Sequence, residues 1–313
     1  MYRLIKLTLA LLFTSCHVAK AQYDAQFRHY FDLESTFNPA AVGKQNLLNV
    51  TAAYALNLAG FEHNPRTMFV SADAPVRFLN MKHGLGATFM NDQLGIFTHQ
   101  RIALQYALTQ PLLGGILALG AQVGVLSEKT DPSRLDLNEA NDPAFTSGKT
   151  DGNGIDLASG LYFYYKKRWY AGLSVQHLNA PRIELGERNE IKIDPSYYFT
   201  AGYNITLRNP FVSIKPSILL RTDGVSYRTD MSTRIVYEHD NKVLYAGIGY
   251  SPANSAMFMF GGSVKGFILG YAYELYTSSL SVGNGSHELV FRYQTEINFA
   301  KKGRNKHQTV RTL

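Results

Sequence analysis

The chain has almost no cysteine, few charged residues and no long apolar segment beyond its first residues. Its 313 residues include one cysteine, Cys16, and one tryptophan, and only 18% are Asp, Glu, Lys or Arg. No stretch after the N-terminal leader approaches the roughly 18 consecutive apolar residues of a membrane helix. A chain that spans a membrane must satisfy its backbone groups internally. If this chain is a membrane protein, it must therefore cross the bilayer as a closed β-barrel.

The N-terminal leader has the organisation of a secretory signal peptide. Arg3 and Lys6 precede an apolar centre at residues 7–13, and Ala19-Lys20-Ala21 forms a small-x-small cleavage site. We expect Sec-type export and cleavage near Ala21. Lipoprotein processing at Cys16 is the alternative, although no branched aliphatic residue stands three positions before it. Cleavage after Ala21 would leave a mature chain without disulfides, thiolate chemistry or cysteine-ligated metal.

The net positive charge of the chain comes from its two ends. The formal net charge is +7, and the leader and the tail after Ala300 together hold eight basic residues and no acidic ones, so the body between them carries about −1. The basic balance therefore does not indicate a nucleic-acid partner. The tail is either disordered or binds an anionic periplasmic partner through Lys301, Lys302, Arg304 and Lys306.

Residues 285–299 give the clearest structural signal, because apolar and polar side chains alternate along them. Leu289, Phe291 and Tyr293 share one face, whereas Glu288 and Arg292 share the other. Alternation is typical of a β-strand, whose successive side chains point to opposite sides. A strand of this length, with aromatic residues near both ends of its apolar face, favours the wall of a membrane barrel, where about 9–11 residues cross the hydrocarbon layer.

The same alternation recurs at the spacing of hairpins. Residues 101–109 and 196–207 alternate as clearly as 285–299. Weaker candidate strands lie near 47–58, 67–75, 84–92, 115–128, 154–166, 168–178, 212–222, 230–240, 243–251, 256–264 and 266–276. We therefore predict an all-β fold, a transmembrane antiparallel β-barrel of about 14 strands.

Loop lengths predict how the barrel is oriented. The longest expected connection is 129–153, which is polar and rich in Asp and Asn. Long loops of bacterial barrels lie outside the cell and short turns face the periplasm, so an even strand number places both termini in the periplasm. The predicted divisions are a signal peptide (1–21), an N-terminal periplasmic or plug-like segment (22–46), the outer-membrane barrel (47–299) and a basic periplasmic tail (300–313).

Short motifs in a fixed order identify a family that the chain resembles. The opening segment contains Asp24-Ala25-Gln26-Phe27 and Phe37-Asn38-Pro39-Ala40. Further motifs are Ser71-Ala72-Asp73-Ala74-Pro75, Gly84-Leu85-Gly86, Asn91-Asp92, Asp142-Pro143-Ala144-Phe145, Trp169-Tyr170-Ala171-Gly172, Gly270-Tyr271-Ala272-Tyr273 and Gly285-Ser286-His287-Glu288. From Tyr23 to Phe299 the chain resembles the PorP/SprF outer-membrane proteins of the Bacteroidetes type IX secretion system. It departs from the family pattern at Ala25, where proline is usual.

The resemblance implies more than the residue pattern does. It implies a barrel similar to long-chain fatty-acid transporters, located in the outer membrane. It also implies a non-enzymatic role in type IX secretion or gliding motility, in which the protein takes part in export or surface anchoring of cargo such as adhesins. The implied partners are the secreted cargo, periplasmic secretion components and outer-membrane lipid.

The sequence offers no convincing catalytic or metal site. Ser286, His287 and Glu288 are consecutive, so in a strand His287 points away from the other two and they cannot form a catalytic array. Isolated carboxylates, expected in the lumen or in loops, are Asp73, Asp92, Asp142 and Glu274. The histidines are scattered without metal-ligand spacing, and no cofactor motif is present. The glycines of 84–86 and 120–124 lack the context of a phosphate loop, and we expect them to allow close packing or curvature.

The segment 22–43 is too aromatic for an ordinary disordered leader. Two placements are possible: it plugs the lumen, or it packs at the periplasmic mouth and forms a partner surface. The residues expected to contribute to that surface are Asp24, Gln26, Phe27, Tyr30, Phe31, Phe37, Asn38 and Pro39.

Three functional hypotheses follow from the sequence. The first is the secretion and anchoring component that the family implies. The second is an outer-membrane channel for small hydrophobic compounds, suggested by the Leu-, Phe- and Tyr-rich strands. The third is an outer-membrane enzyme, which the sequence supports least because no G-x-S-x-G or comparable nucleophile setting is present.

Overall fold

A computed structural model describes residues 23–131, 149–166, 168–186, 189–240, 242–277 and 283–296. The predicted signal peptide, residues 142–145, residues 297–299 and the basic tail, with Lys301, Lys302, Arg304 and Lys306, lie outside the described residues. Within those ranges, no helix is long and apolar enough to cross a membrane.

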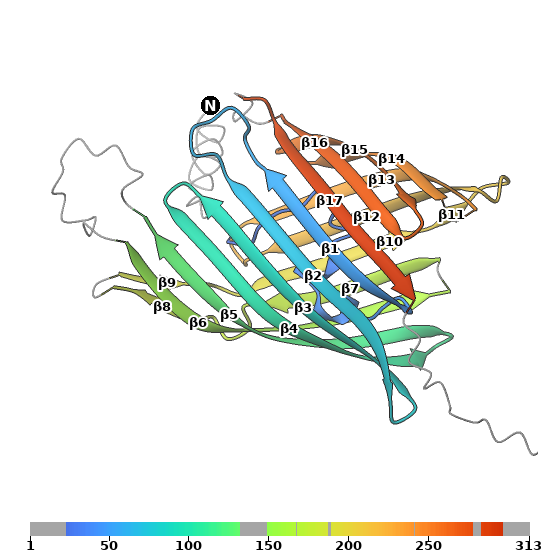
Figure 1. Ribbon diagram of the computed structural model, residues 1–313, viewed down its shortest axis with the longest axis horizontal. Helices are drawn as coiled ribbons and strands as arrows, with labels where there is room; N and C mark the ends of the chain where they lie inside the picture. Colours follow the sequence, from blue (N-terminus) through green and yellow to red (C-terminus); the bar gives the residue numbers. More distant parts are fainter. Residues whose placement is uncertain are drawn as a thin grey trace, which may run out of the picture.

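The described chain forms a closed antiparallel barrel of 14 strands (Figure 1). The strands of the wall are β1 (Leu47–Leu56), β2 (Arg66–Phe78), β3 (Met81–Leu94), β4 (Phe97–Leu112), β5 (Gly115–Thr130), β6 (Thr150–Tyr165), β7 (Trp169–Gln176), β10 (Ser196–Tyr203), β12 (Val212–Thr222), β13 (Tyr227–His239), β14 (Lys242–Ser251), β15 (Ser255–Val264), β16 (Phe267–Tyr276) and β17 (Ser286–Glu296). Each strand pairs with its sequence neighbour in the wall, and β1 pairs with β17 from Leu47↔Glu296 to Leu56↔His287. The predicted fold class and strand number are confirmed.

Alternation along each strand separates a lipid-facing from a lumen-facing side. On β4, Ile102 and Leu104 are 62% and 63% exposed, whereas Arg101 and Gln105 on the opposite face are each 3% exposed. Apolar side chains that would be costly in water are expected to face lipid in a membrane barrel. The wall of this barrel therefore presents its apolar face outward and a largely polar face to the lumen.

Most connections at one end of the barrel are turns of two or three residues, whereas the longest connections lie at the other end. At the first end β2 and β3 are joined by Leu79 and Asn80, and β4 and β5 by Leu113 and Gly114. The connections 57–65 and 177–195 lie at the other end. Because the short turns of bacterial barrels face the periplasm, we refer to these two ends as periplasmic and extracellular.

The structure corrects several predicted boundaries. The loop expected at 129–153 is shorter, since β5 and β6 remain paired out to Thr130↔Thr150. Polar side chains at these strand ends hid the pairing, because a ladder beyond the membrane needs no apolar face. The predicted strand 196–207 divides into β10 and the short β11 (Ile205–Thr206), where the Asn204 amide bonds to the Arg168 carbonyl at 2.6 Å.

The extracellular connection 177–195 contains a hairpin that the sequence analysis missed. It consists of β8 (Arg182–Leu185) and β9 (Asn189–Lys192), which pair only with each other. Ile183 is fully buried against Gly152 and Gly154 of β6. The hairpin thus folds against the inner side of the wall at the extracellular end.

Residues 23–46, which we call the plug, run through the interior of the barrel before β1 begins (Figure 1). The plug has two short 3-10 helices, η1 (Glu34–Thr36) and η2 (Pro39–Ala41). The side-chain amide oxygen of Asn38 accepts a hydrogen bond from the Ala40 amide and caps η2, and Pro39 occupies its first position. The remaining plug backbone is irregular, so its polar groups need partners on the barrel wall.

Candidate functional site

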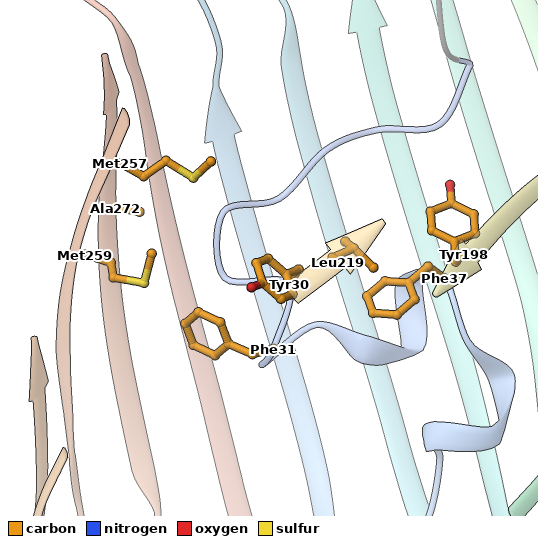
Figure 2. Close-up of a cluster of buried hydrophobic side chains, with 8 residues drawn as sticks. All are labelled: Tyr30, Phe31, Phe37, Tyr198, Leu219, Met257, Met259 and Ala272. Atoms are coloured by element: carbon orange, nitrogen blue, oxygen red, sulfur yellow. The ribbon is translucent and has the colours of Figure 1, made fainter. Parts of the chain in front are cut away.

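The plug packs its aromatic side chains against the inner face of the barrel. Figure 2 shows one such cluster, which joins Tyr30, Phe31 and Phe37 of the plug to Tyr198, Leu219, Met257, Met259 and Ala272 of the wall. Tyr30 is 2% exposed, and its hydroxyl lies 3.0 Å from that of Ser217 and 2.9 Å from that of Ser232. Phe27 enters a second cluster with Phe69 of β2. Burial of each large side chain contributes about 1.5–3 kcal/mol, so apolar contact alone holds the plug firmly.

Glycines in the wall let the plug backbone approach closely. A Cβ atom on Gly84 would lie 2.0 Å from the Val42 carbonyl oxygen, and one on Gly120 would lie 2.2 Å from the Ala40 nitrogen. Neither contact is possible with a larger residue unless the plug moves. The sequence predicted close packing at these glycines, and the segment that packs against them is the plug.

A buried ionic cluster joins the plug to the wall near the extracellular ends of β12, β13 and β16. Arg28 of the plug donates from Nε to Glu274 at 2.7 Å, and Arg228 donates to the other oxygen of that carboxylate at 2.9 Å. Arg228 also bonds to Asp230 at 2.8 Å, and Arg221 bonds to Asp230 at 2.7 Å. Burial alone would lower the pKa of Arg28, but the neighbouring carboxylates, Glu274 first, raise it, so the guanidinium stays charged.

Glu288 holds the same stretch of plug by its backbone. Its two carboxylate oxygens accept the Arg28 amide at 2.7 Å and the His29 amide at 2.8 Å, and one of them also lies 2.7 Å from Nδ1 of His29. All of these groups are buried. A carboxylate is the natural partner for two adjacent amide donors that no secondary structure satisfies. Within the Ser286 to Glu288 motif, Glu288 is thus the residue that contacts the plug.

The first residues of the plug are held on the opposite wall. Asp24 lies 3.0 Å from Nε2 of His177, whose Nδ1 lies 2.8 Å from Asp156, and the Tyr198 hydroxyl donates to Asp24. Burial opposes the charge of each group, yet His177 and its hydrogen bond hold the pKa of Asp24 below its usual range. Likewise, Asp24 and Asp156 outweigh burial and raise the pKa of His177 to about 9. At neutral pH the His177 imidazolium therefore lies beside the Asp24 carboxylate.

Neighbouring polar groups extend this attachment. The Tyr23 hydroxyl donates to Glu128, which also pairs with His99. Tyr23 packs against the cluster of Ile183, Leu185 and Leu126 beneath the β8–β9 hairpin. The start of the plug thus lies close to the extracellular end of the lumen, whereas its last residues lead into β1 at the periplasmic end.

Side-chain amides and hydroxyls satisfy the irregular plug backbone further along. The Phe37 carbonyl accepts from Ser174 at 2.6 Å and from Gln176 at 2.7 Å, and the Thr36 carbonyl accepts from Arg101 at 2.9 Å. Unpaired buried backbone groups are costly. These wall residues therefore determine the path of the plug backbone through the lumen and also help to hold it there.

Little space remains between the plug and the wall. A cavity of about 20 Å³ lies beside Asp24, Phe37 and Tyr198, and one of about 10 Å³ lies beside Tyr23 and His99. Each is the size of roughly one water molecule. A polar pocket of about 120 Å³, lined in part by Asp32 and Arg292, opens on the periplasmic side of the plug.

All eight plug residues predicted to bind a partner lie in or against the lumen. Six of them, Phe27, Tyr30, Phe31, Phe37, Asn38 and Pro39, are buried, while Asp24 and Gln26 are half-buried. Asn38 donates to the Leu161 carbonyl at 3.0 Å, and the Gln26 carbonyl accepts from Arg28 at 3.2 Å. The structure thus places these side chains inside the barrel and away from its surface. Their role in binding a partner stays a prediction.

The family-motif residues divide between the two faces of the wall. On the lumen side, Gly270 faces His29 of the plug. Asp92 accepts a hydrogen bond from Thr67 at 2.6 Å, and Glu288 accepts hydrogen bonds from the plug amides described above. Asn91 precedes Asp92 in β3 and so lies on the opposite, outer face, where it accepts from Gln100 at 2.8 Å.

On the lipid side, Trp169 stacks near Phe163 and Tyr165 at the periplasmic rim, and Tyr271 lies 2.7 Å from His287. Gly285 has φ of 74°, a left-handed conformation that favours glycine at the start of β17.

The possible catalytic residues are engaged elsewhere. Ser286 accepts from the Leu58 amide at 3.0 Å and lies 2.8 Å from the Tyr276 hydroxyl, while His287 is on the other face beside Tyr271. These contacts hold the extracellular turn and orient no nucleophile. Among the described residues, no group of three or more His, Cys, Asp or Glu side chains could hold a metal ion.

Sequence reasoning missed the charged residues that anchor the plug. Arg28, His29, His177 and Asp156 appeared as isolated polar residues, and Glu274 was expected in the lumen or a loop without a partner. One signal was available: Glu274 and Glu288 both fall on the lumen side of alternating strands, where a buried carboxylate needs a cation or several donors. The sequence could not show which segment supplies them.

Comparison with known proteins places the chain in a family. A family model described as type IX secretion system membrane protein PorP/SprF matches residues 19–293. The chain belongs to the PorP/SprF family. The family predicted from the ordered motifs is therefore confirmed. No curated protein matched the chain in sequence.

Among solved structures, the PorP/SprF chain is similar to the CymD monoaromatic hydrocarbon channel. The two are 13% identical with a TM-score of 0.50, over 90% of this chain and 95% of the channel. A FadL homologue from Pseudomonas aeruginosa is 11% identical with a TM-score of 0.48, over 82% and 91% of the two chains. The likeness to CymD shows a shared barrel fold and nothing about substrate. The family and the barrel together make the chain an outer-membrane component of the type IX secretion system.

Proposed function

We propose that this PorP/SprF protein takes part in export or surface anchoring of cargo proteins as a plugged barrel, and that cargo does not pass through its lumen. The observation that carries the proposal is the plug, which packs against the wall with cavities of about 20 and 10 Å³ beside it and a polar pocket of about 120 Å³ on its periplasmic side. Cargo and periplasmic secretion components would then contact the rims of the barrel.

The energetics of the plug support a closed lumen. Opening a path for a polypeptide would separate Arg28 from Glu274 and the plug backbone from Glu288. Breaking one buried ion pair by removing a partner costs about 3–5 kcal/mol, and the aromatic contacts add to that. A barrel that conducts polypeptide would be expected to have a weaker attachment.

A channel for small hydrophobic compounds is the alternative. The barrel likeness favours it only at the level of fold, and apolar side chains such as Phe37 and Met257 do line part of the lumen. The cavities beside the plug are too small for an aromatic hydrocarbon, which needs roughly 150 Å³ in a protein interior.

Deleting residues 23–37 tests the proposal. We expect cell-surface proteins released by protease shaving and counted by mass spectrometry to lose a defined group of secreted proteins, while the barrel stays heat-modifiable in the outer membrane. Asp223→Ala in an extracellular turn serves as the matched control, because the bonds of the Asp223 side chain to other described residues stay within its own turn. An unchanged set of surface proteins would refute the proposal.

Uptake by reconstituted liposomes separates the two readings. The full chain should not increase the uptake of toluene or a similar hydrocarbon over empty liposomes. Saturable uptake by the full chain would favour the channel.

Changing Lys301, Lys302, Arg304 and Lys306 to Gln tests the prediction that the basic tail binds a periplasmic partner. The change should weaken co-purification of periplasmic components, as added salt should in the unmodified chain.

A further inference from the structure

Two neighbouring hairpins at the periplasmic end expose large apolar side chains at their tips. In the β2–β3 hairpin, Phe78 is 64% and Leu79 is 71% exposed, and in the β4–β5 hairpin Leu113 is 85% exposed. The β3–β4 register pairs Lys82 with Thr109, so the two tips lie side by side. Figure 1 shows the β2–β3 hairpin reaching past the neighbouring strands. A water-exposed turn gains no folding stability from such side chains.

The backbone at both tips makes leucine a costly choice. Leu79 has φ of 51° and Leu113 has φ of 49°. Two-residue hairpin turns with positive φ strongly prefer Asn, Asp or Gly, and the left-handed conformation costs other residues about 1–2 kcal/mol. Both tips therefore carry an exposed apolar residue at a position where a polar residue or glycine would stabilise the barrel more.

The tips extend beyond the membrane. His83 and Tyr106 lie on the lipid-facing side of β3 and β4, and Nδ1 of His83 is 2.7 Å from the Tyr106 hydroxyl. A polar pair on the lipid-facing side belongs at the level of the headgroups. Leu113 is seven residues beyond Tyr106 and Leu79 is four residues before His83, about 23 and 13 Å along the strands. Both tips therefore lie on the periplasmic side of the headgroup level, even with the strands tilted by about 35–45°.

A groove beside these tips is positively charged, and none of its lining residues in the described part of the chain is acidic. Its volume is about 620 Å³, and Arg77, Phe78, Leu79, Lys82 and Ile116 are among its lining residues. Arg77 and Lys82 are register partners, directly opposite each other on neighbouring strands. Like charges in that position destabilise a sheet.

Both cations face the mouth of the lumen. Lys82 donates to the Lys44 carbonyl of the plug at 3.0 Å, which places it on the inner side of β3. Arg77 lies four residues after Asp73, whose carboxylate accepts the Gly43 amide of the plug, so it shares that side. The charges therefore point away from the lipid.

We propose that this groove and the two tips, the periplasmic groove, dock an acidic segment of a periplasmic protein that also carries apolar side chains. The like-charge pair supplies the attraction for carboxylates, and Leu79 and Leu113 at the two tips supply apolar contact. The basic tail of this chain and a second copy of the groove are unsuitable occupants because they carry the same charge. The inference rests on the proposed function, since it names where a secretion partner would bind.

Photocrosslinking in cells that make the full chain tests the docking. A photoreactive amino acid is introduced at position 79 or 113, with position 265 in another periplasmic turn as the control site. We expect protein adducts at 79 and 113 whose crosslinked peptide is rich in Asp, Glu and apolar residues. Arg77→Glu with Lys82→Glu should lower the adduct yield at least tenfold, whereas Lys265→Glu should leave it unchanged.

Each other outcome overturns the docking proposal. These outcomes are adducts to lipid alone, no protein adduct, an adduct mapped to a basic segment, or an adduct yield that is the same with and without the charge reversal. Heat modifiability of every variant confirms that the barrel has folded. Counting surface proteins in the same cells distinguishes the two proposals. If the charge-reversal variant loses the adduct but keeps its normal surface proteins, the proposed function is refuted while the docking proposal is supported.

Discussion

The substitution Glu274→Gln provides the sharpest energetic test of the attachment between plug and wall. Glu274 is fully buried and accepts from Arg28 at 2.7 Å, from Arg228 at 2.9 Å and from Ser255 at 2.5 Å. Glutamine keeps the size of the side chain but removes its charge, which leaves two buried guanidinium groups without their shared carboxylate. Breaking a buried ion pair in this way costs about 3–5 kcal/mol.

The loss of stability should affect the plug before the barrel wall. Arg28 belongs to the plug and loses its carboxylate partner, whereas Arg228 of the wall still bonds to Asp230 at 2.8 Å. Hydrogen exchange of the Arg28 and His29 amides reports opening of this stretch. A cost of about 3 kcal/mol predicts exchange roughly 100-fold faster than in the unmodified chain, since about 1.4 kcal/mol corresponds to a factor of ten. Exchange within threefold of the unmodified rate would refute the reasoning.

A paired substitution supplies the control. Replacing Arg28 and Glu274 together with Met removes the charge from both sides, and apolar replacement of a buried pair is often neutral or stabilising. The double variant should exchange more slowly than Glu274→Gln alone. If it exchanges equally fast, packing and not charge holds the plug at this point.

The remaining predictions concern pH and packing. The pKa of His177 is raised to about 9 from a usual 6.5, so its stabilising contribution is complete below about pH 6.5 and is lost as the pH rises through about 9. The free energy of unfolding, measured by urea denaturation, should fall over that interval by up to about 3 kcal/mol, and His177→Gln should remove this pH dependence. An equal fall in both proteins would contradict this origin. The pKa of Asp24 is lowered, so its contribution is present above about pH 4 and is lost only as the pH falls further. Gly84→Val should displace the end of the plug at a cost of about 1–3 kcal/mol, which would make residues 40–46 sensitive to protease. The control Leu85→Ala, on the lipid side, should leave these residues protected. Protected residues 40–46 in the valine variant would contradict the close approach of plug and wall.

The wall of the barrel could be predicted from the sequence because lipid imposes a two-residue period on every strand. Residues 101–109 lie within β4 and residues 286–296 form β17, as their alternation indicated. Strand ends that extend into water follow no such rule, so Thr130 and Thr150 were assigned to a loop although they pair. The β8–β9 hairpin escaped prediction for a related reason, since only Ile183, Leu185 and Ile191 mark its buried side.

The lumen could be predicted only in part. Aromatic residues such as Phe27 and Tyr30 marked the N-terminal segment as one that needs a partner surface, and they left open whether that surface was a neighbour or the barrel itself. Many of the contacts that distinguish these cases join residues far apart in the sequence, such as Tyr162 with Glu34 and His29 with Glu288. One sequence shows which charges need partners and does not show which partners they find.

The central claim is that the plug closes this barrel, and ion conductance across a planar lipid bilayer tests it most directly. The full chain should show no steady conductance, whereas a variant lacking residues 23–43 should form open channels, because the wall closes independently of the plug through the β1–β17 and β10–β12 pairs. Steady conductance of the full chain equal to that of the shortened variant would contradict the account.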